Sequence, residues 1–404
     1  MKTLFLTNEY PPHVYGGAGV HVEYLSRELA RLIDVEVRCF GEQSRREGRL
    51  AVRGYQPGGG HFARTPATLK SPLEAFERCI AFAADPVDAQ VVHCHTWYTH
   101  LGGVVVRRAY GIPLVITSHS LEPLRPWKRE QLGLGFELST WIEKTALEDA
   151  DALVAVSHEM KRDIVRLFDV DESRVHVIHN GIDTDEYRPV AERDRLARFG
   201  LDDGREYVLF VGRITRQKGI IHLVEALAHL DPSIPVVLCA GAPDTPEIGA
   251  EMERKVDQAR RRRGNVLWIR EMVDRATAVQ LYSHAAVFCC PSVYEPFGII
   301  NLEAMACATA VVASAVGGIP EIVVPEKTGL LVPVDFDPDA LFRPRDPDAF
   351  ARGLAAALAR LMADRALRER MGRAGRERAV ESFSWAAIAR QTNDLYGRLT
   401  GRDS

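Results

Sequence analysis

Short apolar stretches alternate with longer amphipathic stretches along the whole chain. In the first half, the apolar stretches of strand length are residues 3–7, 35–40, 90–95, 113–117, 152–156 and 175–178, and the predicted helices are residues 19–33, 72–84, 135–149 and 159–168. In the second half, the predicted strands are residues 207–211, 236–240, 266–269, 286–290, 310–314 and 329–332. Strands that alternate with helices in this way are typical of parallel sheets, so the pattern predicts an α/β fold.

The pattern of strands and helices begins a second time, which indicates two domains. Residues 179–189 are full of residues that favour turns, and the boundary is placed there. We predict an N-terminal domain over residues 1–185, a second domain over 186–382, and a C-terminal amphipathic helix within 383–404. Residues 41–70 bear Gly, Arg and Pro and are expected to form an irregular loop, as is a Pro- and Asp-rich stretch at 333–346.

Length, charge and cysteine content narrow the class of protein. A chain of 404 residues is long enough for two cores, and its net charge of −4 argues against bulk binding to nucleic acid or an acidic membrane. Seven scattered cysteines are typical of reduced thiols in a cytosolic protein. Neither the N-terminus nor the Ala-rich run at 304–316 is long and apolar enough for a signal peptide or a membrane span, so we expect a cytoplasmic location. The sequence does not decide between a monomer and a homo-oligomer.

Two carboxylates flank the start of a predicted helix in the second half. Residues 286–290 form an apolar run that Pro291 ends, and residues 298–307 form an almost wholly apolar helix. Glu295 therefore lies in the loop at the carboxyl end of a strand, and Glu303 lies inside the helix. Ligands bind at this edge of open α/β sheets.

The groups around these carboxylates suit a sugar nucleotide. The backbone N–H groups of Phe297, Gly298 and Ile299, at the helix N-terminus, can hold a phosphate. Glu295 and Glu303 can accept hydrogen bonds from sugar and ribose hydroxyls. The alternative is a surface glutamate in the loop and a solvated one in the helix, but a glutamate within an apolar helix seldom lacks a partner.

A second candidate for phosphate binding is the cationic turn at residues 212–219. It follows a predicted strand and opens a helix that is expected to run to Leu230. Arg213 offers a forked donor and Lys218 a point charge, next to the N–H groups of a helix start. A basic surface turn is the alternative.

The N-terminal domain has a glycine-rich turn of its own at residues 10–19. Gly16, Gly17 and Gly19 would let backbone N–H groups approach a phosphate or a sugar, although a tight structural turn accounts for them equally well. The spacing is not Gly-x-Gly-x-x-Gly, which argues against a nicotinamide dehydrogenase.

Three histidines lie at the carboxyl ends of predicted strands. His93 and His95 point to the same face of their strand, so a metal site is an alternative. Since no further ligand follows at useful spacing, a hydrogen-bonded histidine is favoured. His119 follows the next strand, and a histidine buried in the core is the alternative to a functional one.

Three cations follow His119. Arg125, Lys128 and Arg129 lie close together in the chain, and their composition alone is that of a solvated loop.

Taken together, these segments carry a resemblance to a known family. Glu295 to Glu303 resembles the Glu-x7-Glu signature of retaining glycosyltransferases of the two-domain GT-B type. The segments 10–19, 93–98, 118–130, 212–219 and 292–306 narrow the resemblance to family 4, to the group of bacterial glycogen synthases and maltose-1-phosphate synthases. It covers essentially the whole chain and implies two Rossmann-like domains that face each other across a deep cleft, with the last helix crossing back to the first domain.

The resemblance implies a reaction and a role for each candidate residue. Glucose would pass from ADP-glucose, with retention, to an α-glucan or glucose 1-phosphate through an α-1,4 link, with no metal and no cofactor besides the donor. Arg213 and Lys218 would neutralise the leaving diphosphate, Glu303 would hold the ribose, and Glu295 would bind glucose hydroxyls. His119 would lie by the anomeric carbon. A phosphate on the acceptor would be bound by the cations after it, Arg125, Lys128 and Arg129.

Two departures from the longer glycogen synthases favour the shorter family 4 group. The Lys-Thr/Val-Gly-Gly-Leu element is replaced by Val-Tyr-Gly-Gly-Ala at residues 14–18, and Thr96 stands where those enzymes have Asp. Two alternatives remain: a family 4 enzyme that uses a UDP- or GDP-sugar and another acceptor, and a non-catalytic regulator that binds a nucleotide. A glycoside hydrolase would leave the Arg213 and Lys218 turn without a purpose.

Overall fold

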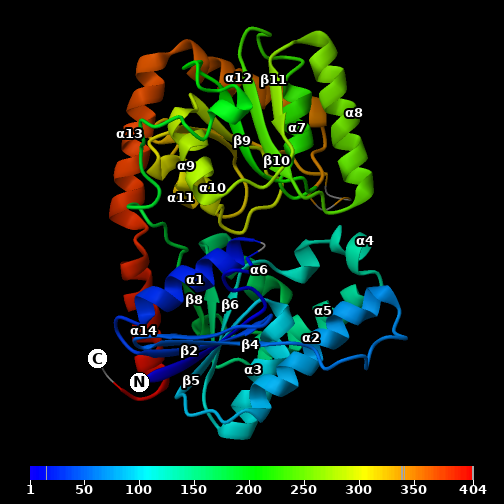
Figure 1. The fold of residues 1–404 in the computed structure, drawn as a ribbon, viewed down its shortest axis with the longest axis vertical. Coiled ribbons are helices and arrows are strands. Elements are labelled where there is room, and N and C mark those ends of the chain that lie inside the picture. The colour runs from blue at the N-terminus through cyan, green and yellow to red at the C-terminus, as the bar shows by residue number, and fades with distance from the viewer. Residues whose placement is uncertain (15, 338–339, 341, 403–404) are drawn as a thin grey trace. The chain divides into compact units, whose positions relative to one another are not determined.

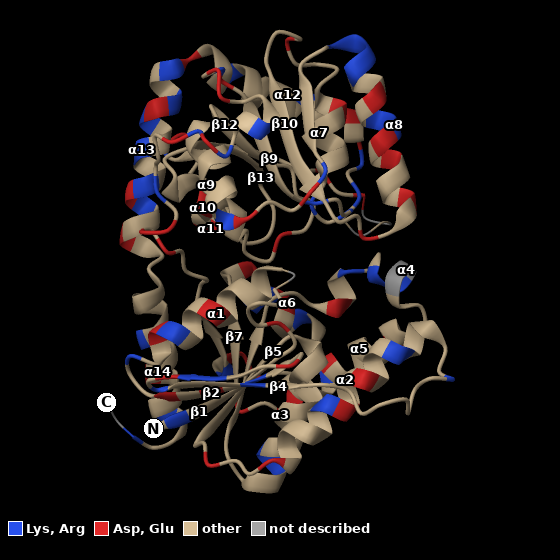
Figure 2. Cartoon of the chain, in the orientation of Figure 1, with Lys and Arg blue, Asp and Glu red and all other residues tan. Residues whose placement is uncertain are grey.

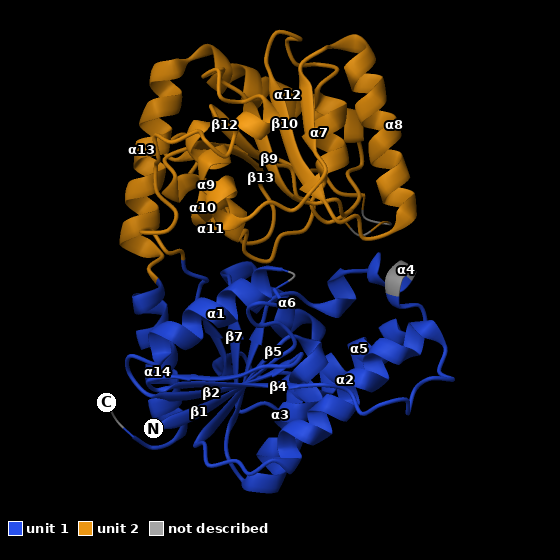
Figure 3. Cartoon of the chain, viewed as in Figure 1, with its two compact units in different colours: residues 1–181, 385–404 blue, residues 182–384 orange. Residues whose placement is uncertain are grey.

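The computed structural model describes residues 1–402 except 15, 338–339 and 341, and the side chains of residues 130 and 131 are also outside the description. The chain divides into two compact units (Figure 3). Unit 1 comprises Met1–Gly181 together with Trp385–Ser404, and unit 2 comprises Ile182–Ser384. The two division points lie within a few residues of the predicted boundaries, and the last helix is part of unit 1.

Unit 1 is built on an eight-stranded sheet with the order β3-β4-β2-β1-β5-β6-β7-β8. The strands are β1 (Lys2–Thr7), β2 (Asp34–Phe40), β3 (Ser44–Glu47), β4 (Leu50–Tyr55), β5 (Val91–His95), β6 (Leu114–Ser118), β7 (Ala152–Ala155) and β8 (Val175–Val177). Every neighbouring pair is parallel except β3 and β4. The parallel core confirms the α/β prediction.

Helices cover both faces of this sheet (Figure 1). They are α1 (Gly17–Leu29), α2 (Ala67–Ala84), α3 (Trp97–Tyr110), α4 (Lys128–Leu132), α5 (Gly135–Asp149), α6 (His158–Leu167) and α14 (Trp385–Leu399). Helices α2, α3 and α5 pack together, while α14 packs on α1, where Trp385 stacks on Tyr24 with ring centroids 5.7 Å apart. This stacking joins the C-terminal helix to the N-terminal unit.

The prediction of an irregular loop at residues 41–70 is wrong. It contains β3, β4 and the first residues of α2. Leu50 and Val52 are buried while Ala51 and Arg53 are not, an alternation that marks this part of β4 as a strand with one buried face. Gly54, which suggested a loop, lies where a Cβ would come within 2.2 Å of the Gly41 carbonyl oxygen, so the glycine serves close packing.

Helix α2 also begins earlier than the predicted residue 72. Pro72 lies inside the helix, in its second turn. A proline there removes the hydrogen bond that its N–H would have given to the carbonyl of Thr68 and crowds that carbonyl. Only the first turn is affected, so the helix extends on both sides of Pro72.

Unit 2 is built on a six-stranded sheet with the order β11-β10-β9-β12-β13-β14, and all of its strands are parallel. The strands are β9 (Val208–Arg213), β10 (Val236–Gly241), β11 (Val266–Ile269), β12 (Val287–Cys290), β13 (Ala310–Ser314) and β14 (Gly329–Val332). The helices are α7 (Ile220–Ala226), α8 (Pro246–Arg262), α9 (Arg275–His284), α10 (Ile299–Ala306), α11 (Ile319–Ile322), α12 (Pro347–Ala363) and α13 (Arg365–Ser382). Read by position in the sheet, this order is that of the Rossmann fold.

The core of unit 2 lies between the sheet and the helices α7, α8 and α12. Phe210 and Leu238 from the strands and Leu223 and Leu354 from the helices are fully buried there. Charged side chains are spread along α8 and α13, whereas the strands carry few (Figure 2). The described part of residues 333–346 contains no helix or strand of the sheet, as predicted.

Each sheet has a point where the chain changes direction across it. In unit 2 this point lies between β9 and β12, and in unit 1 it lies between β1 and β5. Loops that leave the carboxyl ends of such strands diverge and form the ligand site of open α/β sheets. Several predicted site residues lie at these strand ends: Gly16, Gly17 and Gly19 follow β1, Arg213 ends β9, and Lys218 and Glu295 follow β9 and β12. His119 and the three cations after it follow β6, the strand next to β5.

All seven cysteines are free and buried, as predicted. No helix in the described part of the chain is both long enough and apolar enough to cross a membrane.

Candidate active site

In unit 2, Lys218 and Glu295 form an ion pair at the change of direction between β9 and β12. Lys218 Nζ lies 2.6 Å from Glu295 Oε2, and the same oxygen accepts a hydrogen bond from Ser292 Oγ at 3.1 Å. Burial, the largest single influence, lowers the pKa of Lys218, but the charge and hydrogen bond of Glu295 together with Cys290 outweigh it, and the pKa ends above its ordinary value. Lys218 is therefore a stable cation despite being largely buried.

Glycine at position 219 allows the loop that carries Lys218 to approach the end of β12. Gly219 has a φ of +60°, and a Cβ there would come within 2.1 Å of the Pro291 carbonyl oxygen. The Val293 N–H also donates to the Gln217 carbonyl at 3.0 Å. These backbone contacts hold the cationic turn against the loop of Glu295.

Arg213 is the last residue of β9 and has its own carboxylate partner. Arg213 Nη1 lies 2.6 Å from Asp244 Oδ1, which follows the neighbouring strand β10. Asp244 was not predicted as a site residue; its position shortly after a strand was the only signal in the sequence. The structure thus places Arg213, Lys218 and Glu295 at the carboxyl ends of β9 and β12.

Glu303 lies inside α10, as predicted, and is partnered by a tyrosine. Tyr282 Oη donates to Glu303 Oε2 at 2.8 Å. Burial raises the pKa of Glu303, while hydrogen bonds from Tyr282 and Tyr187 partly oppose the rise. Neither tyrosine was singled out in the sequence, because each occurs within an apolar or turn segment without a motif.

The start of α10 lies beside Glu295. Gly298 precedes the helix with a φ of +101°, a conformation that favours glycine. The N–H groups of Phe297, Gly298 and Ile299 are at the end of the helix where backbone donors have no partner within it. The Gly318 N–H donates to the Glu295 carbonyl at 3.0 Å, which fixes the backbone of this loop.

In unit 1, the glycine turn is held by a carboxylate. The Gly16 N–H donates to Glu9 Oε2 at 2.8 Å, and a Cβ on Gly19 would lie 2.8 Å from the same oxygen. Helix α1 begins at Gly17, earlier than the predicted residue 19, so Gly19 lies within its first turn. A carboxylate at this helix end repels a phosphate, so the turn suits neutral sugar hydroxyls better.

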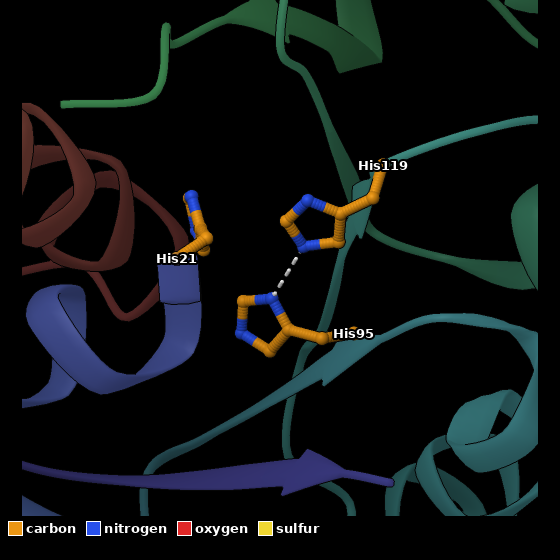
Figure 4. Close-up of side chains that lie close together, drawn as sticks. All are labelled: His21, His95 and His119. Carbon is orange, nitrogen blue, oxygen red and sulfur yellow. Dashed lines mark hydrogen bonds between the residues drawn. The ribbon is translucent and has the colours of Figure 1, made fainter. Parts of the chain in front are cut away.

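A cluster of histidines lies at the other side of the change of direction in unit 1. His95 Nδ1 and His119 Nε2 are 3.2 Å apart, and His21, from α1, packs against His119 with ring centroids 4.7 Å apart (Figure 4). His21 escaped the sequence analysis, although a histidine on the buried face of α1 was the available signal. His93 packs on His95 with ring centroids 4.4 Å apart, but its own nitrogens form hydrogen bonds elsewhere, with Tyr396 Oη at 2.5 Å and Thr117 Oγ1 at 2.7 Å.

The clustered histidines are neutral. Burial lowers the pKa of His21 to about 4, and burial also lowers the pKa of His95 and of His119 well below the ordinary value. Ligand atoms of these three residues lie within 4.8 Å of one another, so they could hold a metal ion. From the sequence, a metal site at His93 and His95 is only the less favoured alternative; the structure groups His95 with His21 and His119 instead.

The three cations after His119 differ in their surroundings. Arg125 Nη1 donates to Ser120 Oγ at 3.1 Å and to the buried Glu122 Oε1 at 3.3 Å. Arg129 instead forms an exposed ion pair with Glu137 at 2.8 Å. Lys128 begins the short helix α4, so this segment is a pair of helical turns and not a solvated loop.

Glu122 belongs to a buried pair of carboxylates that the sequence did not reveal. Ser139 Oγ donates to Glu122 Oε2 at 2.8 Å, and the Glu122 N–H donates to Glu143 Oε2 at 2.7 Å. Burial and the nearby Glu122 raise the pKa of Glu143 well above its ordinary value. The raised pKa favours the protonated form of Glu143, and the Glu122 carboxyl group faces Arg125.

Comparisons with known proteins identify the family of the chain. Residues 15–186 match the model of Glycosyltransferase Family 4, and residues 192–378 match that of Glycosyl transferases group 1. The alpha-maltose-1-phosphate synthase of Mycolicibacterium smegmatis is 47% identical, over 99% of this chain and 100% of the relative. The enzyme of the same name from Mycobacterium tuberculosis is 48% identical with the same coverage. The glycogen synthase of M. tuberculosis is 29% identical over 98% of this chain and 94% of its own.

Solved structures share the fold. Sucrose-phosphate synthase from Thermosynechococcus elongatus aligns with a TM-score of 0.79 at 27% identity, over 99% of this chain and all of that one. The catalytic domain of starch synthase IV from Arabidopsis thaliana, bound to ADP and acarbose, aligns with a TM-score of 0.75 at 19% identity, over 99% of both chains. With both halves matched by family models and relatives similar along its whole length, this chain belongs to the GT-B glycosyltransferases, in the family 4 group that contains the alpha-maltose-1-phosphate synthases.

Proposed function

We propose that this protein transfers glucose from ADP-glucose to glucose 1-phosphate, with retention of configuration, and so forms α-maltose 1-phosphate. The observation that carries the proposal is the ion pair of Lys218 and Glu295 at the change of direction between β9 and β12. A cation for phosphate and a carboxylate for sugar hydroxyls meet there, at the edge where α/β sheets bind ligands. The full-length similarity to two alpha-maltose-1-phosphate synthases supports the choice of product.

In this proposal unit 2 binds the donor. Arg213 and Lys218 exchange part of their contacts with Asp244 and Glu295 for the diphosphate of ADP-glucose. The N–H groups at the start of α10 add donors for the same anion. Glu295 then accepts hydrogen bonds from the glucose, and Glu303 from the ribose.

The reaction exchanges one C–O bond for another. The bond between the anomeric carbon and the diphosphate oxygen breaks, and a bond to O4 of the acceptor forms on the same face of the sugar. The acceptor hydroxyl loses its proton to the leaving diphosphate. Arg213 and Lys218 neutralise the charge that grows on the diphosphate, a task that a divalent cation performs in other phosphate chemistry, so we propose a metal-independent reaction.

The surroundings of Arg125 support a phosphorylated acceptor. Its guanidinium is oriented by Ser120, the residue after His119, and by the buried carboxyl group of Glu122. A guanidinium held in one orientation is suited to a phosphate, which accepts two parallel hydrogen bonds. Thr96 supports the same choice, since its hydroxyl is bonded to Asn8 Oδ1 at 2.6 Å and cannot replace the carboxylate that longer glycogen synthases have here.

Product analysis tests the proposal. The purified protein is incubated with ADP-glucose and either glucose 1-phosphate or a malto-oligosaccharide, and the products are measured by mass spectrometry and by NMR of the anomeric proton. We expect a disaccharide phosphate with an α-1,4 link, in clear excess over chain extension. Extension of the oligosaccharide alone would replace the proposal with a glycogen synthase activity. Consumption of UDP- or GDP-glucose in preference to ADP-glucose would overturn the donor, and consumption of no sugar nucleotide would favour a non-catalytic regulator.

A further inference from the structure

The contact between His95 and His119 has the geometry of a hydrogen bond. His95 Nδ1 and His119 Nε2 are 3.2 Å apart, and Figure 4 shows the two nitrogens pointing at each other. A metal ion bound to both would lie about 2.0 to 2.1 Å from each nitrogen, and both lone pairs would have to converge on a third point. Nitrogens aimed along the line that joins them share a proton instead.

The environment of His95 decides which nitrogen carries that proton. His95 Nε2 is buried and has no partner among the described residues. If His119 were the donor, neutral His95 would carry its own proton on this Nε2, and a buried N–H would be left without an acceptor. If His95 donates from Nδ1, its Nε2 is only a lone pair. Buried N–H groups without a partner are rarer than acceptors without one, so donation from His95 is favoured.

The ring of His95 is also held in place by its neighbours. Phe5 and His93 pack against it with ring centroids 5.0 Å and 4.4 Å away, and it is fully buried. His21, which packs on His119 from α1, is oriented by a 2.7 Å bond from its Nδ1 to Asn180 Oδ1. His119 is the least buried of the three histidines, so its second nitrogen, Nδ1, is better placed to meet a ligand than the buried Nε2 atoms of His21 and His95.

We propose that His95 is a positioning residue: by donating from Nδ1 it holds His119 as the neutral Nδ1–H tautomer, so that His119 presents an N–H donor to the transferred sugar. This inference rests on the proposed function for the identity of the sugar, but the tautomer is a property of the free protein. The role of His95 is to fix the direction and the donor character of His119, without contact between His95 and the substrate.

A matched pair of substitutions tests the role of His95. His95→Asn keeps an N–H donor at the position of Nδ1, whereas His95→Leu has the same branching and no donor. We expect His95→Asn to keep kcat within about fivefold of the wild type and His95→Leu to lower it by about 100-fold, the usual effect of losing one preorganised donor. The KM for ADP-glucose should change much less in both. Thermal unfolding and ADP binding show that each variant is folded.

The tautomer is measured without substrate. Long-range ¹H–¹⁵N NMR of protein with labelled histidine distinguishes protonated from unprotonated ring nitrogens, and the spectrum of His119→Asn identifies the signals of His119. We expect protonated Nδ1 and unprotonated Nε2 in the wild type and in His95→Asn, and a change in His95→Leu.

Three results would overturn the inference. They are a wild-type His119 protonated on Nε2, a folded His95→Asn as inactive as His95→Leu, and a stoichiometric metal ion found by elemental analysis and lost in both His95 variants. An inactive wild type with the expected tautomer would instead contradict the proposed function and leave the tautomer assignment standing.

Discussion

Lys218 and Glu295 are 77 residues apart in the chain, and their charged atoms are 2.6 Å apart in the structure. The two residues belong to the loops after β9 and β12, which are neighbours in the sheet and whose following connections run in opposite directions across it. In the proposed reaction one of them meets the leaving diphosphate and the other the sugar. The ion pair therefore holds the two loops of the proposed donor site next to each other before a donor binds.

The first prediction concerns the cations of the turn. Lys218→Ala and Arg213→Ala should each lower kcat by about 30- to 1,000-fold, because each removes about 2 to 4 kcal/mol of stabilisation from the charge that develops on the diphosphate. Steady-state kinetics with ADP-glucose measure the effect. Arg216→Ala is the matched control, since it removes an exposed cation from the same turn and should keep kcat within about twofold. Wild-type turnover in either site variant would refute the assignment.

The second prediction concerns the pH dependence of nucleotide binding. Burial raises the pKa of Glu303, and this rise is opposed in part by Tyr282, Tyr187, Lys218 and Arg275. The carboxyl group of Glu303 therefore stays protonated at pH values where an exposed glutamate is already ionised. Only the ionised carboxylate accepts two ribose hydrogen bonds. ADP should therefore bind more tightly as the pH rises through the raised pKa of Glu303.

Calorimetric titration of ADP at several pH values measures this dependence. In Glu303→Gln the part of the dependence due to Glu303 should vanish, while the part due to titration of ADP itself remains. The free energy of unfolding of the free protein should also fall as the pH rises from the ordinary carboxyl value through the raised one, and this fall should be absent in the variant. Identical pH profiles for the two proteins would show that Glu303 does not hold the ribose.

Much of the fold follows from the sequence because parallel strands that are buried on both faces are continuous apolar runs. The strands β13 and β14 have the predicted bounds, and β6 and β12 differ from them by a residue at one or both ends. The prediction failed where polar side chains interrupt the run: Arg53 and Gly54 conceal β4, whose pairing with β2 depends on tertiary contacts.

The candidate site could also be predicted only in part. Lys218, Glu295 and Glu303 each lie in a motif that the sequence displays, so they were predicted. The partners of Arg213 and Glu303 were not predicted, because Asp244 follows another strand and Tyr282 lies on another helix, and they become neighbours only when the sheet forms. His21 and Glu122 escaped for the same reason.

The third prediction separates the cations near His119. Arg125→Ala should raise the KM for glucose 1-phosphate by about 10- to 150-fold, the effect of losing about 1.5 to 3 kcal/mol in charge-assisted hydrogen bonds. Arg129→Ala should change it less than threefold, because Arg129 is exposed and paired with Glu137. Initial rates at varied acceptor concentration measure both values. If Arg129→Ala has the larger effect, the phosphate lies over α4 and not beside Arg125.

The fourth prediction concerns the glycine that lets the cationic turn approach β12. Gly219→Ala introduces a Cβ that would lie 2.1 Å from the Pro291 carbonyl oxygen, closer than van der Waals contact allows. The backbone at this position has a φ of +60°, which strains any residue other than glycine. Gly204 has a similar positive φ of +79° but open space around it, so Gly204→Ala is the matched control for backbone strain alone. We expect Gly204→Ala to lower the free energy of unfolding by about 1 kcal/mol and Gly219→Ala by about 2 to 4 kcal/mol.

Because the clash pushes Lys218 away from Glu295, Gly219→Ala should also lower kcat at temperatures where it is fully folded, whereas Gly204→Ala should not. Denaturant unfolding and kinetics on the same samples measure both effects, and equal behaviour of the two variants would show that the close approach to Pro291 does not position Lys218.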